Sequence, residues 1–117
     1  MASPLQPWTK TGTIPVGLQS DDTFDVQNRT IRLHTCSLSN ATRPLADPRP
    51  CWIGVIRRGA SEGVTVALGS CSQYNDFIYN FPQEFIIGPE DVLTLSVRGD
   101  SGDAYKVKLL YTVVQLG

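Results

Sequence analysis

Residues 92–113, VLTLSVRGDSGDAYKVKLLYTV, decide the fold of this chain. Apolar and hydroxyl side chains alternate across residues 92–98, and a turn rich in Gly and Asp follows at 99–103. The alternation resumes across residues 104–115, where Tyr, Val and Leu share one face and Lys106 and Lys108 occupy the other. Side chains two residues apart lie on the same face of a strand, so the stretch predicts a hairpin with one buried face.

The preceding sequence repeats this pattern in shorter segments. β-branched and aromatic side chains concentrate at residues 13–16, 23–26, 29–36, 52–57, 63–68, 77–81 and 84–87. Clusters of Gly, Pro, Asn, Asp and Ser separate these segments at intervals of about ten residues, which is typical of a β-sandwich or barrel. No segment has the spacing of an amphipathic helix, so we expect an all-β chain of about eight strands with little or no helix.

The alternation also predicts which side chains share a face. It places Ile31, Leu33 and Thr35 together in 29–36, and Val64, Val66 and Leu68 together in 63–68. Residues 37–50 contain three prolines and predict a long surface loop of limited freedom.

The first eleven residues differ from the rest of the chain. Pro4 and Pro7 precede an isolated aromatic, Trp8, and proline cannot donate to a central strand. We expect residues 1–11 to form an extended N-terminal arm and residues 12–117 to form the β-sandwich domain. Trp8 is then a candidate anchor in a pocket of a partner subunit, and the alternative is that its ring folds back onto its own domain.

Composition excludes several classes of partner. The 117 residues carry a net charge of -1, and the 10 Lys and Arg residues are scattered, so we expect no nucleic-acid partner. No apolar run approaches the roughly 20 residues that span a bilayer, so we expect no membrane partner. The first residues lack the basic and apolar regions of a secretory signal, and we expect synthesis in the cytoplasm.

The sequence offers no paired set of catalytic side chains. His34 is the only histidine, and it falls on a predicted strand where a solvated or hydrogen-bonded role is expected. The acidic residues lie almost entirely in turns, where Asp caps local backbone groups. Cys36, Cys51 and Cys71 lack the C-x-x-C spacing of a zinc or redox site and are expected to be buried thiols. We expect a protein that is not an enzyme and binds no metal or other cofactor.

One segment carries a resemblance to a known family. Residues 85–97, FIIGPEDVLTLSV, resemble the unit of a Gly-Pro-acid turn followed by an alternating strand that is common in small jelly-roll domains. The whole chain resembles the small β-sandwich decoration (cement) proteins of tailed-phage heads. The fold this implies is a single-domain antiparallel β-sandwich of jelly-roll type.

The resemblance also implies a function. Decoration proteins of this family form trimers on the capsid and clamp neighbouring subunits of the major capsid protein, so the resemblance implies a homotrimer located in the virion. Arg57 and Arg58, at a predicted turn, are candidates for contact with an acidic capsid surface.

The alternative is a carbohydrate- or receptor-binding β-sandwich module of a virion fibre. Sandwich domains bind sugars by stacking exposed aromatic rings, and Trp52, Tyr74 and Tyr79 are the candidates for such stacking. This alternative requires the three rings to be exposed together on one face.

Overall fold

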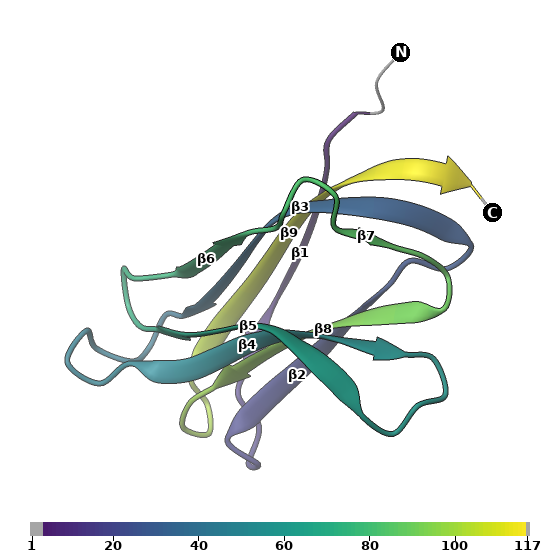
Figure 1. Cartoon of the computed structure of the whole chain (residues 1–117). Helices are drawn as coiled ribbons and strands as arrows, with labels where there is room; N and C mark the ends of the chain where they lie inside the picture. Colours follow the sequence, from purple (N-terminus) through teal and green to yellow (C-terminus); the bar gives the residue numbers. More distant parts are fainter. Residues whose placement is uncertain (1–3, 117) are drawn as a thin grey trace.

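The computed structural model describes residues 4–116 as nine β-strands in two layers (Figure 1). The strands are β1 (Gln6–Thr13), β2 (Gln19–Asp25), β3 (Arg29–Asn40), β4 (Arg49–Arg57), β5 (Gly63–Cys71), β6 (Phe77–Asn80), β7 (Ile86–Ile87), β8 (Asp91–Arg98) and β9 (Ala104–Leu116). Helix is absent from residues 4–116, in agreement with the sequence pattern.

The strand order is that of a jelly roll. One sheet has the order β1-β9-β3-β6, with β7 also paired to β3, and the other has the order β2-β8-β4-β5. The pairings are antiparallel, and strands that follow one another in the chain mostly alternate between the sheets. Because β6 and β7 pair with successive parts of β3, they occupy one strand position. The nine strands therefore fill the eight positions of an antiparallel jelly-roll sandwich.

The core lies between the two sheets, and the hairpin of β8 and β9 supplies seven of the nineteen buried hydrophobic residues in the described part of the chain. On β8 the apolar residues of the alternating pattern are fully buried, and on β9 the face predicted to be apolar is buried from Tyr105 to Tyr111. Lys106 and Lys108 point to solvent, as predicted. The fully buried aliphatic side chains are Ile14, Val26, Ile31, Leu33, Leu38, Ile53, Leu93, Leu95, Val97, Val107 and Leu109.

A β-bulge in β3 changes the predicted face of one residue. Leu33 lies opposite Tyr111 and Thr35 lies opposite Leu110, so His34 is the extra residue of the bulge. The prediction that Thr35 shares the buried face of Leu33 is therefore wrong. Cys36 takes that place and is fully buried.

A second bulge does the same in β5. Ile53 pairs with Ala67 and Gly54 pairs with Thr65, which leaves Val66 as the extra residue. Leu68 consequently pairs with Trp52 on the outer face and is 69% exposed, although the sequence pattern placed it with Val66. The predicted loop is also shorter than expected, because β3 extends to Asn40 and β4 begins at Arg49.

The predicted N-terminal arm is for the most part a strand of the sandwich. Residues 1–3 of that arm lie outside the described residues, whereas Gln6–Thr13 pairs with β9 along its whole length. Pro7 is accommodated because β1 is an edge strand, whose outward backbone groups need no partner in the sheet. The sandwich domain therefore includes β1 and does not begin at residue 12.

The edge formed by β1 and β2 is closed by side chains that cross between the sheets. Lys10 Nζ lies 2.7 Å from Asp22 Oδ1, and this carboxylate is 4% exposed. The ring of Trp8 packs on Phe24 with 5.3 Å between centroids, and Phe24 packs on Tyr111 at 5.1 Å. An ion pair and an aromatic stack thus join the two sheets on this side.

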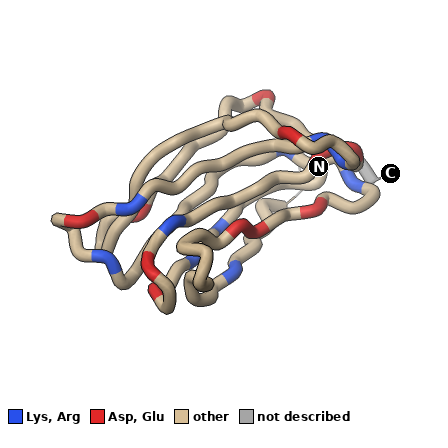
Figure 2. The backbone as a smooth tube through the Cα atoms, turned by 90° about the horizontal axis from the view of Figure 1, so that it is seen from below, with Lys and Arg blue, Asp and Glu red and all other residues tan. Residues whose placement is uncertain are grey.

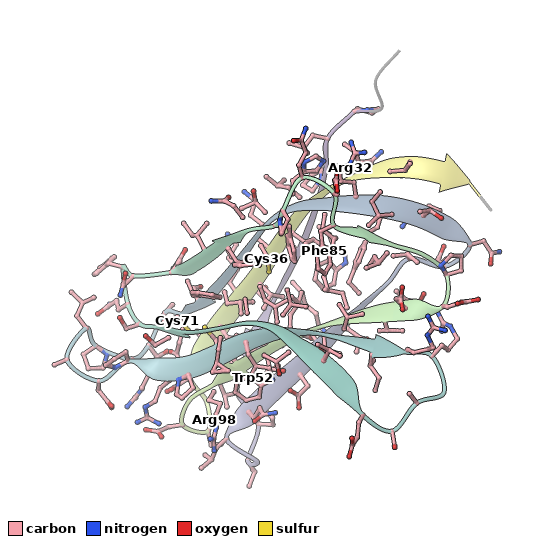
Figure 3. The ribbon with its side chains drawn as sticks, viewed as in Figure 1. Arg32, Cys36, Trp52, Cys71, Phe85 and Arg98 are labelled. Atoms are coloured by element: carbon pink, nitrogen blue, oxygen red, sulfur yellow. The ribbon has the colours of Figure 1, made fainter. Side chains whose placement is uncertain are left out.

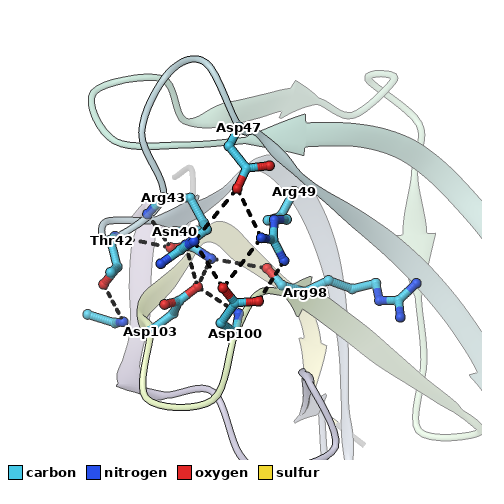
Figure 4. A network of polar contacts seen from close by, with 9 residues as sticks. Asn40, Thr42, Arg43, Asp47, Arg49, Arg98, Asp100 and Asp103 are labelled. Carbon is cyan, nitrogen blue, oxygen red and sulfur yellow. Dashed lines mark hydrogen bonds and ion pairs between the residues drawn. The ribbon is translucent and has the colours of Figure 1, made fainter.

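A polar network closes one end of the sandwich (Figure 4). Its centre is the Asp103 carboxylate, which is 4% exposed and lies 2.9 Å from Nε of Arg43. The same carboxylate accepts hydrogen bonds from Asn40 Nδ2 at 3.3 Å and from the backbone N–H of Asp100 at 2.8 Å. The network therefore ties the turn between β8 and β9 to the end of β3 and the loop that follows it.

The outer part of this network is exposed. Arg49 donates to Asp100 at 2.9 Å and to Asp47 at 3.0 Å, and both carboxylates are about half exposed. The neighbouring guanidinium of Arg49 lowers the pKa of the Asp47 carboxyl, chiefly through this hydrogen bond. Surface ion pairs of this kind contribute little individually, so we assign the stabilisation mainly to the buried centre at Asp103.

Candidate functional site

Exposed apolar side chains gather on the side of the sandwich opposite β1 and β2. Among the described strands, β5 pairs only with β4, and β6 and β7 pair only with β3, so these three strands end their sheets. We call this side the open edge. The large apolar residues exposed on these strands and their connection are Val64, Leu68, Tyr74, Ile78 and Ile86. Unpaired strand edges that carry apolar side chains favour association with another chain.

The two sheets separate along the open edge and leave an apolar groove. At one end they are in close contact, because the Phe77 ring occupies the space that a side chain at position 69 would need, and Gly69 has none. Toward Gly63 the sheets diverge (Figure 1), and Phe85 lies half-buried between them (Figure 3). The groove has a volume of about 390 Å³. It is lined by Val55, Arg57, Val64, Val66, Phe85, Ile86, Ile87 and Asp91.

The two arginines predicted to bind a partner have different surroundings. Arg57 lines the groove, is 71% exposed and lies 3.6 Å from the exposed Glu90 carboxylate. Arg58 donates to both oxygens of Asp25, at 2.8 and 3.2 Å, and to the carbonyl oxygen of Pro89. Arg58 therefore holds three turns together, whereas the Arg57 guanidinium remains available at the rim of the groove.

Trp8, the third candidate for partner binding, lies on β1 at the far side of the molecule from the open edge. Its ring is half-buried against Phe24. This packing within its own domain accounts for the apolar ring. The structure therefore does not bring Trp8 together with Arg57 and Arg58.

The three aromatic residues proposed for sugar stacking are also dispersed. Trp52 lies half-buried on the outer face of β4 (Figure 3). Tyr74 lies in the connection between β5 and β6 and is 90% exposed. Tyr79 packs edge-on against Phe81, at 5.0 Å between centroids and an interplanar angle of 86°. These rings do not form one binding face, and Trp52 lies beside a hollow of the surface.

The remaining side chains that could take part in catalysis or metal binding make structural contacts or lie apart from one another. His34 Nε2 lies 3.0 Å from Thr112 Oγ1, which matches the expected hydrogen-bonded strand histidine. Within residues 4–116, no group of three or more His, Cys, Asp or Glu side chains is arranged to hold a metal ion.

The described part of the chain also contains no helix that could cross a membrane. Basic and acidic residues are interspersed around the loops (Figure 2).

The three cysteines are free thiols buried in the core, as predicted. Cys36 comes from β3 in one sheet, and Cys51 and Cys71 come from adjacent strands of the other. Burial raises the pKa of Cys36 from 9.0 to about 12. A hydrogen bond with Cys71, together with burial, also raises the pKa of Cys51. At neutral pH these two thiols stay protonated and are poor nucleophiles.

We expect Cys36 and Cys51 of the native protein to resist a disulfide reagent such as Ellman's reagent at about pH 8, because the thiolate is the reactive species and burial disfavours it. The hydrogen bond with Cys51 lowers the pKa of Cys71, so only its burial protects this third thiol. All three should react quickly in concentrated guanidinium. Fast labelling of Cys36 in the native protein would contradict its burial.

The same burial makes stability depend on alkaline pH. The Cys36 thiol ionises at about pH 9 in the unfolded chain and at about 12 in the folded protein. Its contribution to stability is therefore complete below about pH 9 and is lost as the pH rises toward about 12. A Cys36→Val variant should lose less stability than the wild type over this range in denaturant titrations.

Sequence reasoning missed most residues of the groove. Val64 and Val66 were expected on a buried face, and Phe85 was not singled out. The one sequence feature that could have pointed to the groove is the short apolar run at residues 85–87, which follows a Pro-containing turn. Nothing in that run reveals that the strand it forms ends the sheet.

Comparisons with known proteins identify the fold and no family. No protein-family model matches the sequence, and the comparison with curated proteins gave no match. Solved structures do match. A mitogen derived from Yersinia pseudotuberculosis has a TM-score of 0.55 and 12% identity, and the match covers 92% of this chain and 86% of the mitogen.

Two matching structures are viral. A chain of the top component of cowpea mosaic virus, described as naturally occurring empty particles, has a TM-score of 0.58 and 12% identity over 100% of this chain and 92% of its own. A protein with a triple jelly roll fold from an archaeal virus has a TM-score of 0.58 and 16% identity. That match covers 98% of this chain and 30% of the viral protein. At these identities the likeness establishes the jelly-roll fold and nothing about function.

Proposed function

We propose that this chain is a non-enzymatic structural protein of a virion and that it assembles through the open edge. The observation that carries the proposal is the apolar groove of about 390 Å³ between β5 and β7. Its walls include Val64, which is 71% exposed, and Ile86, which is 45% exposed. Covering these side chains removes apolar surface from water and provides partners for the unpaired backbone of β5.

The occupant we propose is a second copy of this chain. The two sides of the sandwich are not equivalent, because Lys10 and Asp22 close one edge and the other is open. An edge left open in every copy is repeated in a symmetric oligomer, so one groove per subunit is buried when the oligomer closes. Arg57 and Glu90 at the rim supply charges of both signs for such a contact.

The more specific role that we propose, decoration of a phage head, is based on the resemblance of the sequence to head decoration proteins of tailed phages. In that role the chain is a trimer in the virion and bridges subunits of the major capsid protein. The viral jelly rolls among the similar structures support a virion protein of some kind. The trimer, the phage head and the capsid partner are parts of the proposal.

Light scattering after size-exclusion chromatography tests the assembly. We expect a mass of three times the 12.8 kDa of one chain for the wild type. Val64→Glu should lower the mass to that of one chain, because it places a charge on the apolar wall of the groove. Val16→Glu is the matched control, since Val16 is 86% exposed between β1 and β2 and should leave the mass unchanged.

A wild-type monomer at high concentration would overturn self-assembly. A stable oligomer that both variants preserve would place the interface elsewhere. Circular dichroism should be the same for both variants, because both valines are exposed and neither belongs to the buried core.

A further inference from the structure

A row of hydroxyl side chains crosses the outer face of the sheet β2-β8-β4-β5. The register places Thr23 opposite Thr94, Thr94 opposite Gly54, and Gly54 opposite Thr65. Four neighbouring strands thus contribute three threonines and one glycine to a single row. Trp52 precedes Gly54 by two residues, so its ring lies on the same face beside the gap.

The glycine opens a hollow beside the ring. A Cβ at Gly54 would lie 2.8 Å from Thr94 Oγ1 and 3.2 Å from the carbonyl oxygen of Val64, so a larger residue would fill the space. The hollow measures about 200 Å³, and its walls include Trp52, Ile56, Thr65 and Thr94. This is smaller than the roughly 300–1,000 Å³ of pockets that enclose drug-sized ligands. A ligand with one ring lying against the surface fits such a hollow.

We propose that this hollow is a binding site for a neutral carbohydrate, with one pyranose ring stacked on Trp52. Its apolar C–H face would contact the indole ring, and its hydroxyl groups would exchange hydrogen bonds with Thr94 and Thr65. A longer oligosaccharide would run along the row toward Thr23 on β2.

Charges of both signs lie on this face near the ring. Asp21 is exposed on β2 and accepts a hydrogen bond of 2.6 Å from Ser96 Oγ, and Ser96 lies opposite Trp52. Arg98 is exposed on β8 two residues beyond Ser96, so it lies on the same face. A carboxylate and a guanidinium together favour neither a cationic nor an anionic ligand, and both can form hydrogen bonds with the hydroxyl groups of a neutral sugar.

The hollow adjoins the groove proposed above for assembly, because Val55 and Val64 line both. Trp52 and Thr94 line the hollow and not the groove. Loss of sugar binding in Trp52→Phe or Thr94→Val should therefore leave the oligomer mass unchanged, and an unchanged mass in these variants separates the failure of this proposal from the failure of self-assembly.

Tryptophan fluorescence tests the site, because the chain has two tryptophans and only one lies at the hollow. In a Trp8→Phe variant all tryptophan emission comes from Trp52. We expect this emission to change on titration with cello-, manno- or galacto-oligosaccharides and to stay constant with sialyllactose. A Trp52→Phe variant, which keeps Trp8, should show no change with any of these probes.

Hydroxyl variants made in the Trp8→Phe background locate the binding. Thr94→Val and Thr65→Val should each weaken the response, up to about tenfold, because each removes one hydrogen-bonding hydroxyl. Thr9→Val on β1 is the matched control and should have no effect, since Thr9 is exposed on the other sheet. The proposal is overturned if no neutral oligosaccharide changes the Trp52 emission, or if the change persists undiminished in both Thr94→Val and Thr65→Val.

Discussion

Replacement of Asp103 by alanine is expected to lower the free energy of unfolding by about 3–5 kcal/mol, the usual cost of removing one partner from a buried ion pair. The carboxylate is 4% exposed and lies 2.9 Å from Arg43 Nε. Without it, the amide of Asn40 and the backbone N–H of Asp100 lose a buried acceptor. The Arg43 guanidinium loses its buried ion-pair partner and keeps only the half-exposed carboxylates of Asp100 at 3.0 Å and Asp47 at 3.6 Å. Equilibrium unfolding in urea, followed by circular dichroism, measures the loss.

The matched control is Asp47→Ala in the same network. Asp47 is 51% exposed and pairs with Arg49 at 3.0 Å, so its loss should cost no more than about 1 kcal/mol. Equal losses for Asp47→Ala and Asp103→Ala would contradict a network centred on Asp103. A large loss for Asp103→Ala alone would show that the turn between β8 and β9 is anchored from its buried side.

Local alternation predicted the strands that supply the core. The period of two in residues 92–98 and 104–115 assigns each side chain to a face, and the buried apolar side chains of β8 and β9 follow that assignment. Burial on one face is a strong constraint, because a shift of one residue would expose the whole apolar set. The hairpin could therefore be identified without knowledge of its neighbours.

The same reasoning failed wherever a bulge interrupted a strand. The bulges at His34 and Val66 each add one residue and reverse the faces beyond it, so Thr35 and Leu68 point outward. Neither position carries a glycine or proline that would signal a bulge. The bulges are visible only when both paired strands are known.

The candidate sites depend on contacts between strands that are distant in sequence. The groove combines Val64 of β5 with Phe85, which precedes β7. The hydroxyl row joins residues as far apart as Thr23 and Thr94. Sequence reasoning selected Arg57 and Trp52 from these sites by residue type, and it could not supply their neighbours because the strand order was unknown.

Adjacent leucines on β9 provide the most direct test of register. Leu109 is fully buried between the sheets, whereas Leu110 lies on the outer face and is only partly covered. Leu109→Ala should lower the free energy of unfolding by about 2–5 kcal/mol, since it removes buried methyl groups and leaves a cavity. Leu110→Ala removes the same atoms from a partly solvated position and should cost less than about 1 kcal/mol.

The comparison holds residue type, strand and position along the chain nearly constant, so the difference in stability measures only which face is buried. A register shifted by one residue would reverse the order of the two losses. Leu109 lies opposite Trp8 on β1 and opposite Cys36 on β3, and all three are on the face that packs against the other sheet. Equal losses for Leu109→Ala and Leu110→Ala would contradict the assignment of Leu109 to the buried face of β9, and with it the register of a strand that, together with β3, supplies most of the core side chains of its sheet.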